Sequence, residues 1–203
     1  TIAGETHKVP TPFLVMATQN PIETEGTYPL PEAQVDRFMM KVLVGYPQED
    51  EEFVIVQRVI GQAIEVAAVT STDQIAQLQK TCRQGYVDPS LIQFAVKLVS
   101  ATRHPERFGL ADWSRFITFG ASPRATIALI EGARALAFLR GRSYALPQDV
   151  LDLVPDVLRH RLVLSYEALS EGLTPEAIIA QILQAVPVPD KPLDSHVRTA
   201  PAA

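Results

Sequence analysis

The first hydrophobic run in the chain spans residues 13–17 and contains neither a charge nor an alternation of apolar and polar positions. Such a run is typical of a strand buried on both faces, as in a parallel sheet. Thr18, Gln19 and Asn20 follow it directly, and Pro21 cannot donate a ladder hydrogen bond. Because ligands of open α/β sheets lie just beyond the carboxyl ends of the strands, the pattern makes Asn20 a candidate site residue. An ordinary polar turn after a core strand fits this stretch as well.

The segments around this run also favour an α/β arrangement. Residues 1–4 and 6–9 are short β-prone runs around Gly4 and Glu5, which predicts a hairpin. A proline at position 31 favours a short helix over residues 31–38, and the apolar run that follows predicts a second strand over residues 39–44.

Four consecutive acidic residues at 49–52 could be mistaken for a metal site at a strand end. Residues 45–48 separate them from the predicted strand, however, and acids in a first helical turn are favoured by the helix dipole. We therefore interpret them as the solvated start of a helix over residues 49–59.

From residue 70 onward, apolar positions recur at helical spacing, and polar residues followed by proline predict where several helices begin. Prolines then become frequent beyond residue 186, as in a loose tail or linker. The predicted domains are an α/β remnant over 1–70, an all-α domain over 71–186 and a tail over 187–203. The expected helices cover residues 72–85, a segment beginning at 88–89, residues 122–140, residues 147–160 and a segment beginning at 174–175.

One predicted loop, over residues 104–120, is rich in aromatic side chains. It could pack onto the helices or present a contact surface, and packing is the interpretation that we favour.

Composition bounds the function. The 203 residues are 47% hydrophobic, as in a globular protein, and the net charge of −5 argues against a nucleic-acid partner. Cys82 is the single cysteine, which fits a reducing compartment, and neither a leader nor a membrane-spanning run is visible. We expect a cytoplasmic protein. Since the sequence begins with Thr1 rather than Met, it suggests part of a longer protein, although a processed or trimmed start would look the same.

Several catalytic signatures are absent from the sequence. There is no Gly-x-x-x-x-Gly-Lys-Ser/Thr phosphate loop, no strand ending in an acidic pair, and no metal-ligand spacing among the four histidines and one cysteine. We predict no metal site, no tight binding of a nucleotide and no hydrolysis by this chain alone.

Three short motifs follow one another along the chain: ATQNP at 17–21, YPLPEAQVDRF at 28–38 and GASPRA at 120–125. Together they resemble sensor 1, the arginine-finger helix and sensor 2 of the MoxR family of AAA+ ATPases. The resemblance extends from residue 1 to about residue 189. It implies the C-terminal part of a P-loop AAA+ nucleotide-binding domain, an α/β remnant here, followed by a helical lid.

The resemblance implies a role for each matching residue. Asn20 would be sensor 1 and would orient the attacking water through its amide. Arg37 would be an arginine finger acting in trans, which is the interpretation that we favour; the alternative is a cation that merely suits the helix dipole or pairs with Asp36 or Glu32.

Arg124 would be sensor 2. It is predicted in a first helical turn, where a cation is disfavoured but where backbone N–H groups and a guanidinium could converge on a phosphate. A surface arginine that points to solvent or pairs with Glu131 is the alternative. The basic residues 159–161 are interpreted as a solvated helix end with no functional role.

For the intact protein, the resemblance implies ATP and Mg²⁺, a homo-oligomeric ring (usually a hexamer) and chaperone-like remodelling of client proteins. It also implies partners with von Willebrand factor A domains. The alternatives are a stand-alone helical adaptor without nucleotide chemistry, or a related ring motor such as a magnesium-chelatase-type subunit or a replicative-helicase relative. Low basic content disfavours the helicase.

Overall fold

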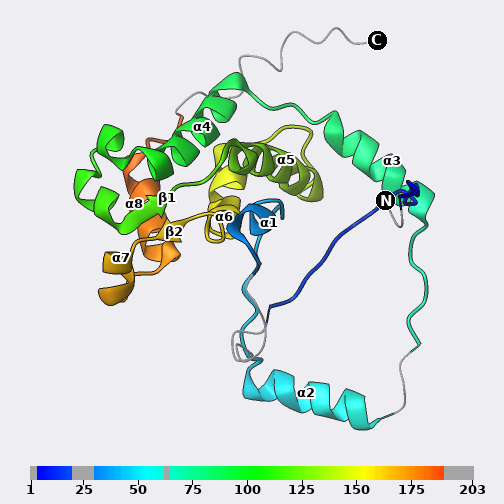
Figure 1. Cartoon of the computed structure of the whole chain (residues 1–203). Coiled ribbons are helices and arrows are strands. Elements are labelled where there is room, and N and C mark those ends of the chain that lie inside the picture. Colours follow the sequence, from blue (N-terminus) through cyan, green and yellow to red (C-terminus); the bar gives the residue numbers. More distant parts are fainter. Residues whose placement is uncertain (1–3, 20–29, 62–64, 190–203) are drawn as a thin grey trace, which may run out of the picture. The chain divides into compact units, whose positions relative to one another are not determined.

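A computed structural model describes residues 4–19, 30–61 and 65–189 (Figure 1). The chain divides into two compact units. The first comprises the described parts of 1–27 and 43–81, and the second comprises those of 28–42 and 82–203. None of the helices in the described part is both long and apolar enough to cross a membrane.

In the first unit, the expected strand over residues 13–17 is not formed, and most of its side chains are exposed. No strand is assigned to the described residues of the expected hairpin or to residues 39–44 either, although Gly4 does adopt a positive φ of 88°. A strand requires a hydrogen-bonded neighbour, and the described residues supply no neighbouring strand to these segments.

Helix α2 (Glu49–Ile60) confirms the interpretation of the acidic run. All four acids lie in its first turn, and the Gln48 backbone N–H donates to the Glu51 carboxylate at 3.0 Å. Helix α3 (Thr72–Arg83) follows within the range predicted for it. None of the residues in these two helices, which are described throughout, is buried.

The core lies in the second unit, where α5 (Pro123–Leu139) packs against α4 (Pro89–Arg103) and α6 (Pro147–Leu158), and α8 (Pro175–Ala185) packs against α4 and α6 (Figure 1). Small residues on the buried face of α5 permit a close approach. A Cβ added at Gly132 would come within 2.9 Å of the Leu153 side chain of α6. The remaining elements of this unit are α1 (Glu32–Val35), η1 (Pro105–Phe108), η2 (Ala111–Phe116), β1 (Ile117–Phe119), β2 (Val163–Leu164) and α7 (Tyr166–Ser170).

Local capping explains where these helices begin. The Asp88 carboxylate accepts from the Ser90 N–H at 2.8 Å, and the Thr174 hydroxyl accepts from the Ala177 N–H at 3.3 Å. In each case a proline occupies the first helical position, as the sequence predicted.

The aromatic segment packs onto the helices, as expected, through η1, η2 and the antiparallel pair of β1 and β2. Phe116 is buried, and Trp113 contacts it edge to face with ring centroids 5.8 Å apart. Phe119 is the exception, because its side chain is exposed. The predicted tail lies almost wholly outside the described residues.

Candidate functional site

Of the three candidate residues, the structure describes Arg37 and Arg124, whereas Asn20 lies outside the described residues. Arg37 follows α1 in a turn, because α1 ends at Val35 rather than near Phe38. Its side chain is exposed and has no hydrogen bond or ion pair with any residue that the structure describes. The alternative in which Arg37 pairs with Asp36 or Glu32 is therefore not the arrangement seen.

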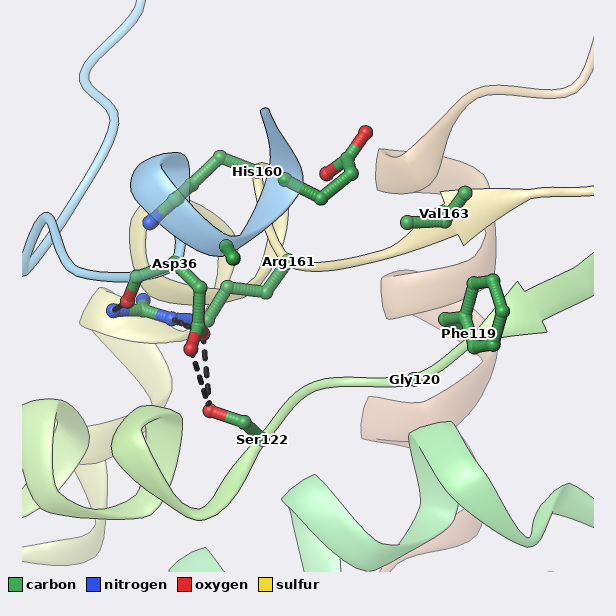
Figure 2. Close-up of a pocket in the computed structure, with 9 residues that line it drawn as sticks. Asp36, Phe119, Gly120, Ser122, His160, Arg161 and Val163 are labelled. Atoms are coloured by element: carbon green, nitrogen blue, oxygen red, sulfur yellow. Dashed lines mark hydrogen bonds and ion pairs between the residues drawn. The ribbon is translucent and has the colours of Figure 1, made fainter. Parts of the chain in front are cut away.

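Asp36 instead lies at the centre of a polar cluster (Figure 2). Its carboxylate accepts from the Ser122 hydroxyl at 2.9 and 3.0 Å, from the Arg124 guanidinium at 3.1 Å and from Arg161 Nε at 3.1 Å. Burial alone would raise the pKa of Asp36, but these three donors outweigh it and lower that pKa below the ordinary value of 3.8.

Arg124 lies in the first turn of α5, as predicted. Its backbone N–H donates to the Ser122 hydroxyl at 3.2 Å, so Ser122 caps α5 and donates to Asp36 at the same time. The Asp36 carboxylate compensates for the unfavourable position of the Arg124 cation at a helix N-terminus. The alternative in which Arg124 pairs with Glu131 or only points to solvent is therefore not the arrangement seen, although its side chain remains 54% exposed.

The interpretation of residues 159–161 as a solvated helix end was wrong. Arg161 is buried, and all of its donors bind acceptors: the Asp36 carboxylate and the backbone carbonyl groups of Asp36, Phe38, Met39 and Val157. The reason is that the segment after α1 covers the end of α6 and presents its carbonyl groups to this arginine. A basic triplet after an apolar helix has the same sequence pattern whether it is solvated or docked, so sequence reasoning missed Arg161.

The neighbours of Arg161 extend this contact. His160 Nε2 lies 3.2 Å from the Phe38 carbonyl oxygen, and Arg159 donates to the Lys41 carbonyl at 2.5 Å. Burial and the nearby Arg161 charge lower the pKa of His160 below its ordinary value, so the imidazole is neutral at pH 7 and donates from Nε2 to Phe38.

A pocket of about 260 Å³ lies beside the cluster (Figure 2). Among the described residues, no group of three or more His, Cys, Asp or Glu side chains is placed to hold a metal ion. The exposed arginines near this cluster are Arg37, which follows Asp36 in the chain, and Arg124 in the first turn of α5; neither lines the pocket. The pocket is lined by Glu32, Ala33, Asp36, Phe119, Gly120, Ser122, His160, Arg161 and Val163.

Comparison with protein families gives two matches. Residues 1–40 match the ATPase family associated with various cellular activities (AAA), and residues 113–182 match the AAA lid domain. The second match includes Arg124 and Arg161, and the first includes Asn20 and Arg37.

Individual relatives agree with these matches. Chaperone MoxR1 of Mycobacterium tuberculosis is 49% identical over 188 residues, which are 93% of this chain and 50% of the relative. The uncharacterised protein YeaC of Bacillus subtilis is 41% identical over 192 residues, covering 93% of this chain and 57% of the relative. Protein MoxR of Paracoccus denitrificans is 35% identical over 195 residues, covering 86% of this chain and 56% of the relative.

A solved structure extends the agreement to the fold. The crystal structure of a candidate ATPase from Cytophaga hutchinsonii matches with a TM-score of 0.89 and 41% identity, over 94% of this chain and 58% of that one. The chain thus spans about half the length of the curated relatives that it matches. Its three sequence strings, its lid helices and these relatives lead to one assignment: the chain belongs to the MoxR family of AAA+ ATPases.

Proposed function

We propose that this chain supplies the sensor and arginine-finger residues of a ring-forming ATPase that remodels client proteins. The observation that carries the proposal is the contrast between Asp36 and Arg37. Asp36 is held by three donors, whereas the adjacent Arg37 is exposed and has no partner among the described residues. A fixed backbone with a free guanidinium is the arrangement that a finger reaching into a neighbouring subunit requires.

Arg124 fits a role as sensor 2. Arg124 belongs to the first turn of α5, and its half-exposed guanidinium and the positive end of that helix both favour an anion such as an ATP phosphate. The Asp36 carboxylate would then share Arg124 with that phosphate. Asn20 is proposed to orient the attacking water as sensor 1.

The residues of this chain fit ATP only in part. They offer cations for the phosphates, but the sequence contains no phosphate loop, and the described residues offer no ligand cluster for Mg²⁺. When bound, Mg-ATP supplies the phosphoryl group whose transfer the arginines would stabilise. We therefore propose that the intact protein binds Mg-ATP and that this chain alone binds it weakly or not at all.

The remaining assignments extend the family relationship. We propose a homo-oligomeric, hexameric ring in the cytoplasm, with client proteins and proteins containing von Willebrand factor A domains as partners. The relative named Chaperone MoxR1 supports the remodelling role.

The experiment measures ATP turnover by the full-length protein carrying Arg37→Ala. We expect ATP binding to stay within about twofold, because a guanidinium acting in trans contributes mainly where charge develops in the transition state. Turnover should fall by about 10³–10⁵-fold, the effect of arginine fingers in other systems.

Mixing provides the control. Arg37→Ala subunits combined with subunits that carry a disabled phosphate loop should regain activity, because some interfaces then pair an intact loop with an intact Arg37. A lowered melting temperature without such complementation would show that Arg37 is structural and would overturn the proposal.

A further inference from the structure

The basic residues after α6 hold the segment that carries Arg37. We propose that Arg161 is a positioning residue for Arg37, because it fixes the backbone on both sides of Arg37 to the lid of the same subunit. The inference rests on the function proposed above for Arg37. It adds a residue that contacts neither nucleotide nor partner subunit and acts only through the segment it holds.

The hydrogen bonds of Arg161 carry the argument. A guanidinium has five N–H donors, and the Arg161 side chain, which is only 2% exposed, places all five on acceptors. Four of these bonds reach residues 36–39, on either side of Arg37. Nε donates to Asp36 Oδ1 at 3.1 Å, Nη2 to the Asp36 and Phe38 carbonyl groups at 3.1 and 2.5 Å, and Nη1 to the Met39 and Val157 carbonyl groups at 3.1 and 2.5 Å.

Neighbouring residues continue the same contact along the chain. The Lys41 N–H donates to the Asp156 carbonyl at 2.8 Å, while its carbonyl accepts from Arg159. The Met39 side chain reaches helix α5, because a Cβ added at Gly132 would lie 3.3 Å from its terminal methyl group. Residues 36–41 are therefore attached to the helices of the second unit by both backbone and side-chain contacts.

Arg161 and Arg37 have different roles in this arrangement. Arg161 is buried and neutralised by Asp36, whereas the Arg37 side chain is exposed. A movement of the lid consequently carries Arg37 with it. Because Asp36 binds both Arg161 and Arg124, its carboxylate joins the segment that carries Arg37 to the N-terminus of α5.

Arg161→Lys is the informative substitution. Lysine keeps the charge but has three donors on a single atom, so it cannot reach acceptors spread over four residues. Arg115→Lys is the matched control, since Arg115 is an exposed lid arginine that pairs with Glu167 and Glu171.

The first readout is limited trypsin digestion of this chain, followed by mass spectrometry. Cleavage after Arg37 requires the segment to leave the lid, so its rate follows the population of the released state. We expect Arg161→Lys to accelerate this cleavage by about 10–30-fold, since several hydrogen bonds are lost. Cleavage after Arg58 in the exposed helix α2 serves as the internal reference, and its rate should be the same in all variants. In the Arg115→Lys protein, the rate of cleavage after Arg37 should also be unchanged.

The second readout is ATP turnover by the full-length protein. Arg161→Lys should lower kcat by at least about tenfold, since misplacing a catalytic group by about an ångström has effects of this size. The Kd for ATP should stay within about twofold. The double variant Arg37→Ala/Arg161→Lys should be no slower than Arg37→Ala alone, because Arg161 has no effect once its target is removed.

These results separate the two proposals. Normal turnover in Arg37→Ala would overturn the proposed function itself. Slow turnover in Arg37→Ala, together with normal turnover in Arg161→Lys or an additive loss in the double variant, would overturn only the positioning role. If Arg161→Lys does not fold, Arg161→Gln, which keeps two N–H donors on one nitrogen, replaces it, and unchanged trypsin cleavage after Arg37 in that variant would also overturn the inference.

Discussion

The carboxylate of Asp36 and the imidazole of His160 lie in one partly buried neighbourhood and respond to it differently. Burial raises the pKa of Asp36, but hydrogen bonds from Ser122, Arg124 and Arg161 reverse the effect and lower it overall. For His160, burial and the Arg161 charge both lower the pKa below 6.5. At neutral pH the carboxylate is ionised and the imidazole is uncharged, which suits a cluster that already contains two arginines.

This difference predicts how stability depends on pH. As pH falls below about 6.5, the unfolded chain protonates His160 while the folded chain does not, so the free energy of unfolding should fall between pH 7 and pH 5. His160→Gln keeps an N–H donor for the Phe38 carbonyl but cannot titrate, and should flatten this part of the profile. Urea unfolding followed by circular dichroism at pH 5, 6 and 7 measures the slope.

The acid range provides an independent check on that experiment. The pKa of Asp36 is lowered, and so is that of the buried Asp149, because hydrogen bonds from Arg142, the Leu146 N–H and Arg140 outweigh burial there. The stability these carboxylates contribute is complete above about pH 4 and is lost as pH falls through their folded-state pKa values. His160→Gln should leave this lower range unchanged. An identical slope between pH 7 and pH 5 in the variant and the parent would show that His160 is not the group responsible.

Among the described glycines, Gly120, in the turn between β1 and α5, leaves the least room for a side chain. A Cβ added at Gly120 would lie 2.3 Å from the Thr102 carbonyl oxygen and 2.8 Å from the Arg103 backbone nitrogen, both in α4. The next residue is fixed as well, because the Ala121 N–H donates to the buried Thr102 hydroxyl at 2.9 Å. This close approach places Ser122 and Arg124 opposite Asp36.

Gly120→Ala should therefore destabilise the protein strongly. Backbone atoms of a helix cannot move aside as a flexible side chain can, so we expect a loss of about 3 kcal/mol, at the upper end of the range for overpacking. Thermal unfolding measures this loss. Gly45→Ala is the control, since a Cβ at Gly45 meets no atom within 4 Å. Equal melting temperatures for the two variants would contradict the packing argument.

The elements also show how far sequence reasoning reaches. The starts of α4, α5 and α8 were predicted because each helix is capped by a residue close to it in sequence. The hydrogen bonds of Asp88, Ser122 and Thr174 reach backbone N–H groups only two or three positions further along the chain. The contact between Asp36 and Arg161 joins residues 125 positions apart, and no local pattern indicates it. The strand expected over residues 13–17 failed for a related reason, since a strand depends on partners elsewhere in the sequence.

In the candidate site too, features set by neighbouring residues could be predicted, whereas contacts between distant residues could not. The placement of Arg124 in a first helical turn followed from the Ser122 cap and the proline after it. That its guanidinium binds Asp36 could not be predicted, because this requires knowing that the segment after α1 packs beside α5. The exposure of Arg37 could not be predicted either, because it depends on Arg161 occupying the neighbouring acceptors, which are the Asp36 carboxylate and the carbonyl groups of Asp36 and Phe38.

On the scale of the whole molecule, burial differs sharply between the two units. Helices α4, α5, α6 and α8 share one core of fully buried aliphatic side chains. Helices α2 and α3, described in full, bury none of their residues, and several large apolar side chains of α2 are exposed. Since helices of this length are marginal in water without tertiary packing, the two units should differ greatly in local stability.

Hydrogen exchange of the backbone amides tests this difference. In this chain, amides of α2 should exchange within about 10–100-fold of an unstructured peptide, because opening a helix without buried contacts has little free-energy cost. Amides in the middle of α4 and α5 should exchange only through global unfolding, and hence at least about 10³-fold more slowly than α2. Mild guanidinium should abolish the protection of α4 and α5 together, since they share one core. Protection of α2 equal to that of α5 would mean that α2 is covered in solution, and its exposed apolar side chains would then have to be assigned to an interface.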